Sequence, residues 1–466
     1  MSEKQKNTFS SKRLAFSTIS FIYSLTSIGT LAFYSMLKDY FHLTPSQLNL
    51  YNSIISFAFI FKPAYGFISD NFLICGSRRE IYLVIFGLLA SIIYVNLSFF
   101  HISVLFVTSL QIIINISSGM LNSVSQAFLV EDSNISLNQE NDLEKVNLNL
   151  NNSTIIENPQ EEANKRTSRT NDNVSLFYFL DSFGLLSISF LSGFLTQNLG
   201  FSDVFLLCAI FPFIMSIIGF ILFNKADFIK KKFEKTLVSR IRTACGYICQ
   251  KEIILPIILI FIISLQPSTY DALMYFYMND LKFDYEFIGL IQVAGSIGSI
   301  ISIALFNRFC KKIKIRNLIL LAIISEIMIN LFQLIQIFKL DYIIFRISPK
   351  LFALFYQTIY NLTQELQNMP IFVLTCKLCP MNSEAFIYEI GCSMRMLAYS
   401  ISYRSGGWLI DLFGITATNF KNLWILWLIS ALFPIITIPP LFCIKLRDSY
   451  EEESKYLLND EVRAKE

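Results

Sequence analysis

Histidine and charge are both scarce in this chain of 466 residues. Its two histidines are His42 and His101, and only 16% of its residues are charged, whereas 54% are hydrophobic. Haem and histidine-rich metal sites are therefore disfavoured. The mean hydropathy of +0.52 argues against an ordinary soluble domain, and the net charge of +3 is too small for a nucleic-acid partner. This composition is typical of a helical protein that crosses a membrane many times.

Features of several other protein classes are missing as well. The nine cysteines lie mostly in apolar stretches without an even framework of spacings, so we expect reduced core residues and not disulfides. Cys376-Lys-Leu-Cys379 has the spacing of a metal-binding pair but lacks the second pair that a structural zinc site needs. No glycine-rich phosphate loop is present, so ATP is not the direct energy source. We therefore expect neither a metal nor a cofactor.

Long hydrophobic runs, in contrast, are plentiful. A membrane-spanning helix needs about 20 mostly apolar residues, and twelve stretches of the chain meet this requirement. We therefore predict an all-α membrane protein with twelve transmembrane helices in two six-helix halves. The predicted spans are Leu14–Met36, Leu48–Ile68, Ile81–Phe100, Val104–Val130, Val174–Thr196, Val204–Phe223, Ile253–Tyr275, Phe287–Phe306, Leu318–Phe338, Leu351–Cys376, Phe386–Phe413 and Leu423–Ile444.

Lysine and arginine are distributed unevenly between the two sides of these spans. Most of the 38 flank the side that holds both termini, which the positive-inside rule makes cytoplasmic. We expect a multi-pass protein of the plasma membrane, with an organellar membrane as the alternative. The few basic residues on the opposite side are Lys38, Lys282, Lys339, Arg346, Lys350 and Lys421.

Two polar insertions divide the chain. Residues 131–173 are rich in Asn, Glu and Ser, which predicts a disordered cytoplasmic loop. Residues 224–252 are basic and lie midway along the chain, so we interpret them as a cytoplasmic linker at the anionic inner leaflet. The expected organisation is an N-terminal half (1–223), this linker, a C-terminal half (253–444) and a cytoplasmic tail (445–466).

The second predicted span carries Lys62 in its middle, and the loop after it holds Asp70, Arg78 and Arg79. A lysine in hydrocarbon costs about 2.5 kcal/mol or more unless it faces a cavity or a counter-charge, so it usually marks function; the alternative is a snorkelling side chain. Asp70 and the arginines can clamp two helices by charge-assisted hydrogen bonds. Arg308 follows the eighth span in the equivalent place, although cytoplasmic loops are commonly basic. This turn resembles the loop between helices 2 and 3 of major facilitator transporters, and we predict a gate formed by these four loop residues.

Three longer stretches match one family in order, spacing and residue identity. They run from Leu37-Lys-Asp39 to Arg79, from Gln266-Pro-Ser-Thr-Tyr-Asp271 to Gly289, and from Met369-Pro-Ile-Phe-Val-Leu-Thr-Cys-Lys-Leu-Cys-Pro380 to Ala385. Together they resemble the folate-biopterin transporter family, which has a fold like that of the major facilitators. The chain departs from the family's pattern at Gln126-Ala-Phe-Leu-Val-Glu131, where an aspartate is commonly found and only the glutamate is kept, which leaves the substrate open.

The resemblance implies secondary active transport of folate, pterin or p-aminobenzoate-like organic anions, coupled to protons, by alternating access. The alternative within transport is another small organic solute, such as an amino acid, a nucleoside-like base or a sugar derivative. A membrane-embedded enzyme is the third interpretation, but such enzymes usually need a buried histidine beside Ser, Asp or a metal, and both histidines here lie near one surface. The abundance of Asn, Ile, Lys and Phe is typical of AT-rich protist genomes, such as those of apicomplexans.

Arg395, in the span Phe386–Phe413, is the first candidate for a substrate contact. A guanidinium binds carboxylate bidentately and stacks on flat rings, as a pteridine with carboxylates requires. The alternative is a salt bridge between helices, with Glu389, Glu326 or Glu365 as the partner. At 100° per residue, Arg404 lies on the opposite face of the helix from Arg395.

Acidic residues inside the spans are candidates for proton coupling, because a carboxylate that titrates between two openings is what coupling needs. These are Asp181, Asp271 and Glu389, and a structural ion pair is an equally good interpretation of each. Pro267 predicts a helix break that would present Ser268 to a ligand. The predicted substrate contacts, in which the tyrosines would stack on a pterin, are Lys62, Ser268, Tyr270, Asp271, Tyr356 and Arg395.

Overall fold

The computed structural model describes residues 17–72, 74, 79–151, 159–225, 251–309, 313–377 and 384–443. Within these ranges only the backbone is described for 70–71, 130–172, 224–225, 251–253, 315, 373–377, 384–388 and 443. Arg78, most of the linker 224–252 and the tail 445–466 lie outside the described residues, and so does most of the Lys377-Leu-Cys-Pro380 motif.

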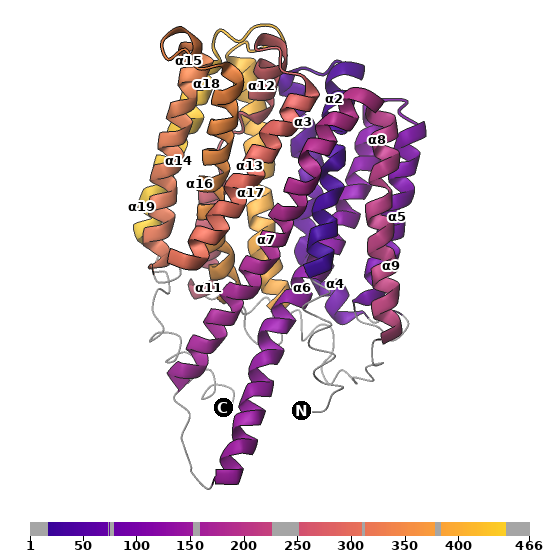
Figure 1. The fold of residues 1–466 in the computed structure, drawn as a ribbon, viewed down its shortest axis with the longest axis vertical. Coiled ribbons are helices and arrows are strands. Elements are labelled where there is room, and N and C mark those ends of the chain that lie inside the picture. The colour runs from indigo at the N-terminus through magenta and orange to yellow at the C-terminus, as the bar shows by residue number, and fades with distance from the viewer. Residues whose placement is uncertain are drawn as a thin grey trace.

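The described helices form an elongated bundle along one axis (Figure 1). In Figure 1, α15 (Leu340–Ile343) lies at the upper end, and α6 and α7 project from the lower end. Eight segments of the described chain are long and apolar enough to cross a membrane on their own. The elements that contribute to them are η1 (Thr26–Ile28), α2 (Gly29–Ser35), η2 (Met36–Tyr40), α5 (Glu80–Phe99), α6 (Val104–Asn151), α7 (Pro159–Leu199), α8 (Phe201–Cys208), α9 (Ile210–Lys225), α13 (Tyr285–Phe309), α14 (Ile315–Ile337), α18 (Leu423–Leu432), η6 (Phe433–Thr437) and α19 (Ile438–Cys443).

The other four predicted spans coincide with helices that are interrupted or more polar. The second span consists of α3 (Pro45–Ser56), η3 (Phe57–Phe61) and α4 (Lys62–Asn71), and the seventh of α11 (Lys251–Ser264), α12 (Tyr270–Tyr275) and η4 (Phe276–Asp280). The tenth and eleventh are α16 (Pro349–Lys377) and α17 (Glu384–Leu412). These four spans contain most of the charged residues that the sequence placed inside the membrane. Each of the twelve predicted spans therefore overlaps described helices, although residues 14–16 and 444 lie outside the described residues.

The described parts of the segment 131–173 are helical, where the composition predicted disorder. We expected disorder, but α6 continues to Asn151 and α7 begins at Pro159, so that both helices run beyond the bundle (Figure 1). The residues from 131 to 151 include no proline or glycine and several good helix formers, Leu, Glu, Gln and Lys. Proline fits the first position of a helix, because the missing N–H has no partner there in any case. The cytoplasmic loop predicted for 131–173 stays a prediction, and residues 152–158 lie outside the described residues.

Two loops at the upper end repeat each other closely. The π-helical turns η2 and η4 each end in a hydrogen bond from the residue after the turn to its first carbonyl, Phe41 N to Met36 O and Leu281 N to Phe276 O, both 3.0 Å. A residue with positive φ follows in each loop, at 54° for His42 and 57° for Lys282. Shared backbone geometry 240 positions apart supports the two-half arrangement that the sequence indicated.

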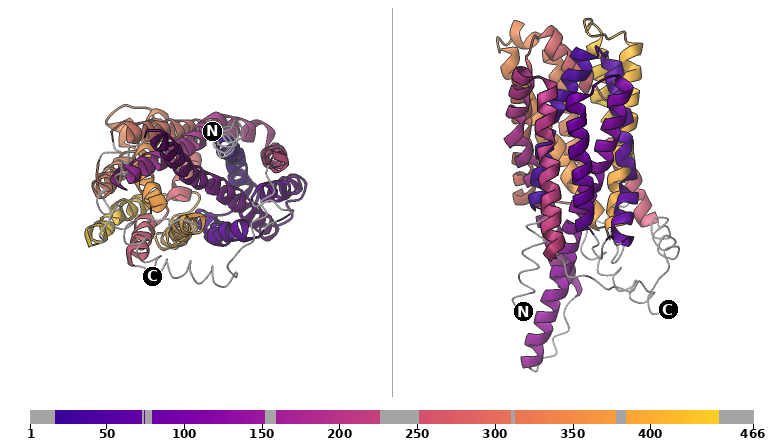
Figure 2. Two further views of the ribbon diagram at one scale, coloured as in Figure 1. Left: turned by 90° about the horizontal axis from the view of Figure 1, so that it is seen from below. Right: turned by 90° about the vertical axis from the view of Figure 1, so that its right-hand side faces the viewer.

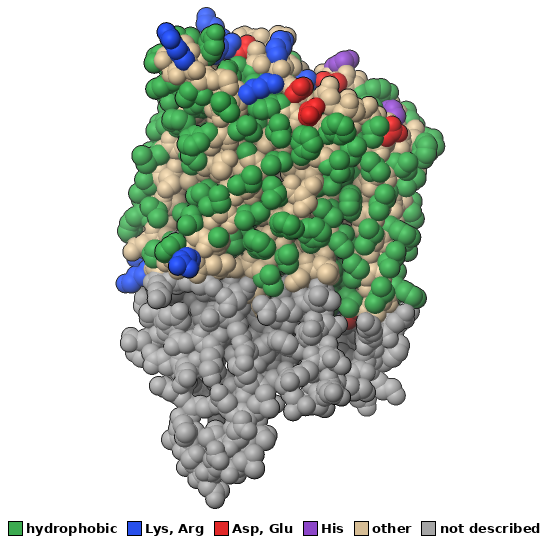
Figure 3. Space-filling model, viewed as in Figure 1, with side chains coloured by type: hydrophobic (Ala, Val, Ile, Leu, Met, Phe, Trp, Pro, Cys, Tyr) green, Lys and Arg blue, Asp and Glu red, His purple; other side chains and the backbone are tan. Residues whose placement is uncertain are grey.

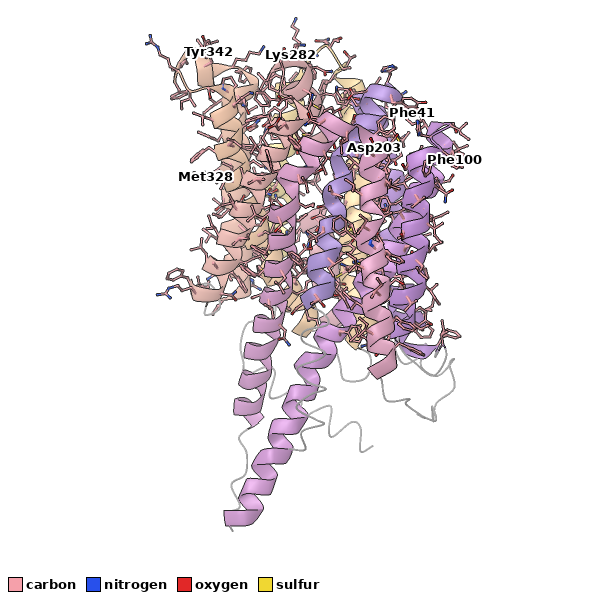
Figure 4. The ribbon with its side chains drawn as sticks, turned by 45° about the vertical axis from the view of Figure 1, so that its right-hand side comes forward. Phe41, Phe100, Asp203, Lys282, Met328 and Tyr342 are labelled. Atoms are coloured by element: carbon pink, nitrogen blue, oxygen red, sulfur yellow. The ribbon has the colours of Figure 1, made fainter. Side chains whose placement is uncertain are left out.

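The surface of the bundle is suited to lipid. Figure 3 shows hydrophobic side chains over the middle of the described part, with charged and histidine side chains gathered at the upper rim. In Figure 4, Met328 lies on the outer side of the bundle, and it is 68% exposed. Lys282 and Tyr342 lie at the upper end in the same view. An apolar band below a polar rim is the pattern of a helical membrane protein.

The N-terminal and C-terminal helices lie side by side (Figure 2). They meet along two seams, α7 against α13 and α3 with α4 against α17. At the first seam a Cβ on Gly193 would lie 2.4 Å from the backbone oxygen of Tyr285, and Gly289 faces Gly193 directly. Small residues allow two helix backbones to approach this closely. Large hydrophobic clusters contain residues of both halves, so the halves are packed together at both ends of the bundle.

Replacing Gly298 by alanine should destabilise the protein, because α13 and α16 touch at this point. A Cβ on Gly298 would lie 2.0 Å from the carbonyl oxygen of Thr358, a backbone atom that cannot move without separating the helices. Overpacking of this kind costs about 1–3 kcal/mol, so we expect a lower melting temperature in detergent. Ile297→Ala is the matched control, since Ile297 is 42% exposed on the same helix. Equal melting temperatures for Gly298→Ala and wild type would contradict this packing.

Candidate substrate site

The seventh span is broken at residues 265–269, between α11 and α12, as Pro267 predicted. The backbone groups that the break leaves without helical partners form hydrogen bonds with other parts of the protein. The Pro267 carbonyl accepts from Ser430 Oγ at 2.9 Å, and the Ser268 carbonyl accepts from Asn49 Nδ2 at 3.3 Å. The Ser268 amide donates to the Ser402 carbonyl at 2.9 Å. These backbone groups of the break are thus held by three other helices and are not directed at a ligand.

Two cavities border the break. The C-terminal cavity, about 410 Å³, is lined by residues of the C-terminal half between Ile263 and Ser430. The N-terminal cavity, about 440 Å³, is lined mostly by the N-terminal half, from Tyr23 to Leu185. Tyr270 and Tyr403 line both. Each volume is in the range of sites for small organic molecules.

The C-terminal cavity combines tyrosines, amides and one carboxyl group. Glu326, on α14, is only 4% exposed and accepts from Gln364 Nε2 at 2.9 Å and from Gln367 Nε2 at 3.4 Å. The rings of Tyr356 and Tyr360 are stacked, with centroids 5.7 Å apart. Flat apolar walls with a few fixed polar groups suit a small aromatic or polyhydroxylated ligand.

The N-terminal cavity contains two carboxyl groups. Asp271, on α12, is fully buried, and its Oδ2 accepts from Asn52 Nδ2 of α3 at 2.9 Å. No described group lies within hydrogen-bond reach of its Oδ1. Asp181, on α7, accepts a hydrogen bond from Ser24 Oγ in the first span. The Asn52–Asp271 contact joins the two halves of the protein beside the cavity.

The sequence places Lys62 and Arg395 in the predicted site, but among the described lining residues of the two cavities there is no lysine or arginine. Lys62 is 5% exposed and donates from Nζ to Asn122 Oδ1 of α6 at 2.8 Å. Arg395 donates from Nε and Nη2 to the Tyr399 hydroxyl at 3.0 and 2.7 Å. Its guanidinium also lies over the Phe372 ring, 4.9 Å from the centroid. Both cations therefore have partners within the protein.

An acidic residue on another helix interacts with this arginine. Glu365, on α16, interacts electrostatically with Arg395 and with Asp181 of the other half. Glu389 is 1% exposed on the same helix as Arg395. Arg404, in contrast, is exposed, as the opposite helix face predicted. Glu365 thus links Arg395 to Asp181, and these three ionisable side chains form a cluster that spans both halves.

The predicted gate lies partly outside the described residues. Arg78 lies outside them, and only the backbone is described for Asp70. Arg79 is 4% exposed, with its guanidinium 5.9 Å from the centroid of the Phe128 ring. Arg308 is exposed and lies over its neighbour Phe309. The gate therefore stays a prediction.

Contacts join the halves beside and below the cavities. Beside them, Ser53 Oγ donates to the Ser400 carbonyl at 2.8 Å, and Ser400 Oγ to the Ser53 carbonyl at 2.9 Å. Toward the lower end, Ser175 Oγ donates to Asn307 Oδ1 at 2.7 Å. There the rings of Tyr178 and Phe372 also stack, 4.2 Å between centroids. The described halves are thus in contact both beside the cavities and at the lower end of the bundle.

Sequence reasoning missed the polar lining around Glu326, which it considered only as an ion-pair partner. A signal was present, since Gln364 and Gln367 are three residues apart and therefore share a helix face. It missed the serine pair at positions 53 and 400 altogether, because small hydroxyl residues are common in membrane helices and carry no distinctive pattern.

Relatives with known names match most of the chain. The sequence matches the BT1 family over residues 25–144 and 153–460. It is 25% identical to folate transporter 2 of Plasmodium falciparum, covering 91% of this chain and 86% of that protein. It is 28% identical to folate transporter 1 of the same organism (91% and 78% covered) and 26% identical to the folate-biopterin transporter of Synechocystis (91% and 80%).

Solved structures with the same fold are similar over nearly their whole length. A nucleoside transporter, NupG, aligns with a TM-score of 0.59 at 13% identity, over 93% of this chain and 98% of that one. A D-xylose–proton symporter aligns with a TM-score of 0.59 at 14% identity, over 91% and 96%. At such identities the likeness shows the fold alone, which is that of the major facilitators. The family match covers most of the sequence, and the chain therefore belongs to the BT1 family, the folate-biopterin transporter family that its motifs indicated.

Proposed function

We propose that this protein carries folate- or pterin-type molecules across a membrane by alternating access. The observation that carries the proposal is the pair of polar cavities that border the broken span, one in each half, with Tyr270 and Tyr403 lining both. The halves, residues 1–223 and 253–444, would rock about these cavities and open them to each side in turn. The relatives are named folate and folate-biopterin transporters, and these names supply the substrate class.

The C-terminal cavity is the proposed substrate site. Ser268, Tyr270 and Tyr356 line it, and the tyrosines offer faces on which a pteridine can stack. Contact of the substrate's carboxylates with Arg395 or Lys62 is a separate hypothesis, because neither side chain lines the cavities. An amide-and-tyrosine lining also suits a nucleoside-like base or a sugar derivative, which is the competing substrate class.

Asp181, Asp271 and Glu389 are the proposed proton sites. Asp271 has the strongest support, since it is fully buried in the seam between the halves and has one oxygen without a described partner. A proton on this carboxyl would remove a buried charge, and so would change the balance between the two conformations. The D-xylose–proton symporter shares the fold, which is compatible with coupling of this type.

The orientation follows from the charges that flank the spans. We propose that both termini, and the lower end of the bundle, face the cytoplasm, most consistently with a plasma membrane. Asp70, Arg78, Arg79 and Arg308 would then act as the cytoplasmic latch. The relatives are transporters, and we assign this chain no enzymatic activity.

Uptake by proteoliposomes tests the proposal. The purified full chain should accumulate radiolabelled folate or pterin, and an acidic exterior should accelerate uptake if protons move with the substrate. Asp271→Asn should abolish the response to the pH gradient while exchange of substrate across the membrane persists. Asp203, on α8, is an exposed carboxylate (Figure 4). Asp203→Asn is therefore the matched control and should behave as wild type. Uptake of a nucleoside or a sugar, with no folate or pterin uptake, would reject the substrate class.

A further inference from the structure

The carboxyl group of Glu326 lies in the C-terminal cavity, and the side chains that donate to it in the described part of the chain are both amides. Its Oε1 accepts from Gln364 and its Oε2 from Gln367. A buried carboxylate has about four acceptor positions and needs donors for stability. The described lining of this cavity holds no lysine or arginine. The remaining acceptor capacity of Glu326 is therefore suited to N–H donors of a ligand.

Aromatic rings lie beside the same carboxyl group. Tyr356 and Tyr360 interact electrostatically with Glu326, and their rings are stacked with an angle of 24° between planes. The Tyr356 hydroxyl contacts Asn330 Oδ1 at 3.3 Å, and Trp427 Nε1 donates to the Asn330 carbonyl at 2.8 Å. Fixed, planar walls next to an acceptor favour a flat ring that presents donors at its edge.

We propose that Glu326 binds the amino-pyrimidinone edge of a pterin ring. A 2-amino-4-oxopyrimidine presents its exocyclic N–H and its N3–H side by side, and these match the two oxygens of one carboxylate as a guanidinium does. This inference rests on the proposed function and specifies it: the transporter recognises the pterin head of its substrate, and the recognition residue belongs to the C-terminal half.

Two ring compounds that differ at one position provide the probe. Pterin carries an amino group at carbon 2, whereas lumazine carries an oxo group there and would set an oxygen against the carboxylate. Binding of each to the purified full-length protein is measured by calorimetry. We expect wild type to prefer pterin about ten- to hundredfold, the usual discrimination of a bidentate contact.

Glu326→Gln should lower the affinity for pterin by a similar factor and raise that for lumazine, because the amide can donate to the 2-oxo group. Glu326→Asp keeps the carboxylate on a shorter stem, so it should weaken pterin binding but retain the preference. Asp203→Asn serves again as the control for a lost surface charge. If Glu326→Gln does not fold, the pterin and lumazine affinities of wild type and of Glu326→Asp test the role of Glu326.

Equal affinities of wild type for pterin and lumazine would overturn the role of Glu326, and so would an unchanged preference in Glu326→Gln. In either case pterin binding itself would leave the proposed function standing. A wild-type protein that binds neither pterin nor folate would remove both proposals together, and binding of a nucleoside or a sugar would then name the competing class.

Discussion

A disulfide between positions 53 and 400 should stop uptake, and a reductant should restore it. Ser53 lies on α3 and Ser400 on α17, in different halves, and their Oγ atoms are 3.3 Å apart. Each hydroxyl also donates to the other's carbonyl, so the two backbones are close. Cysteines at such separations can form a disulfide when their Cβ atoms lie about 3.5–4.5 Å apart. Alternating access requires this seam to open, and a covalent link would hold it shut.

The double variant Ser53→Cys with Ser400→Cys is compared, oxidised and reduced, with both single variants. A second pair, Ser175→Cys with Asn307→Cys, applies the same test to the lower end, where the two side chains are in contact across α7 and α13. Each link should block transport, while substrate binding to the purified protein should survive at least one of them. An oxidised double variant that is fully cross-linked by mass spectrometry, yet transports as wild type does, would contradict a rocking seam between α3 and α17.

Features that depend on local sequence were predictable. Span lengths follow from bilayer thickness, and the break after Ser264 follows from Pro267. The opposite faces of Arg395 and Arg404 follow from helix periodicity. The helical continuation of α6 to Asn151 was not predicted, because asparagine and glutamate are compatible both with a disordered loop and with a solvated helix.

Features that depend on the register between helices were not predictable. Lys62 was predicted to contact the substrate or to pair with an acidic residue. Its described hydrogen-bond partner is instead the side-chain amide of Asn122, sixty residues further along the chain. Hydropathy also fails to separate residues that face lipid from those that line a cavity, since both faces of a buried helix are largely apolar. Glu326 was therefore visible as a charge in the membrane, whereas its place in the C-terminal cavity depended on how α14 and α16 pack.

Arg395→Gln should destabilise the protein strongly, and neutralising Glu365 as well should restore much of the loss. Arg395 is 9% exposed, its guanidinium donates to Tyr399, and it interacts electrostatically with Glu365. Removing one partner of a buried charge pair leaves the other charge without compensation, which costs about 3–5 kcal/mol for close pairs. No salt bridge is described between Arg395 and Glu365, so we expect the free energy of unfolding to fall by the lower end of this range, about 3 kcal/mol. The melting temperature of the purified protein in detergent measures the loss.

The same variants decide whether Arg395 also contacts substrate. Arg395→Lys keeps the charge but loses the planar fork that binds Tyr399 and lies over Phe372. If the role is structural, its melting temperature should fall between those of wild type and Arg395→Gln. The double variant Arg395→Gln with Glu365→Gln should then recover stability. Folate and neutral pterin should both bind its folded fraction with unchanged affinity. A selective loss of folate binding, with the affinity for neutral pterin kept and no recovery in the double variant, would instead place the substrate's carboxylate on Arg395.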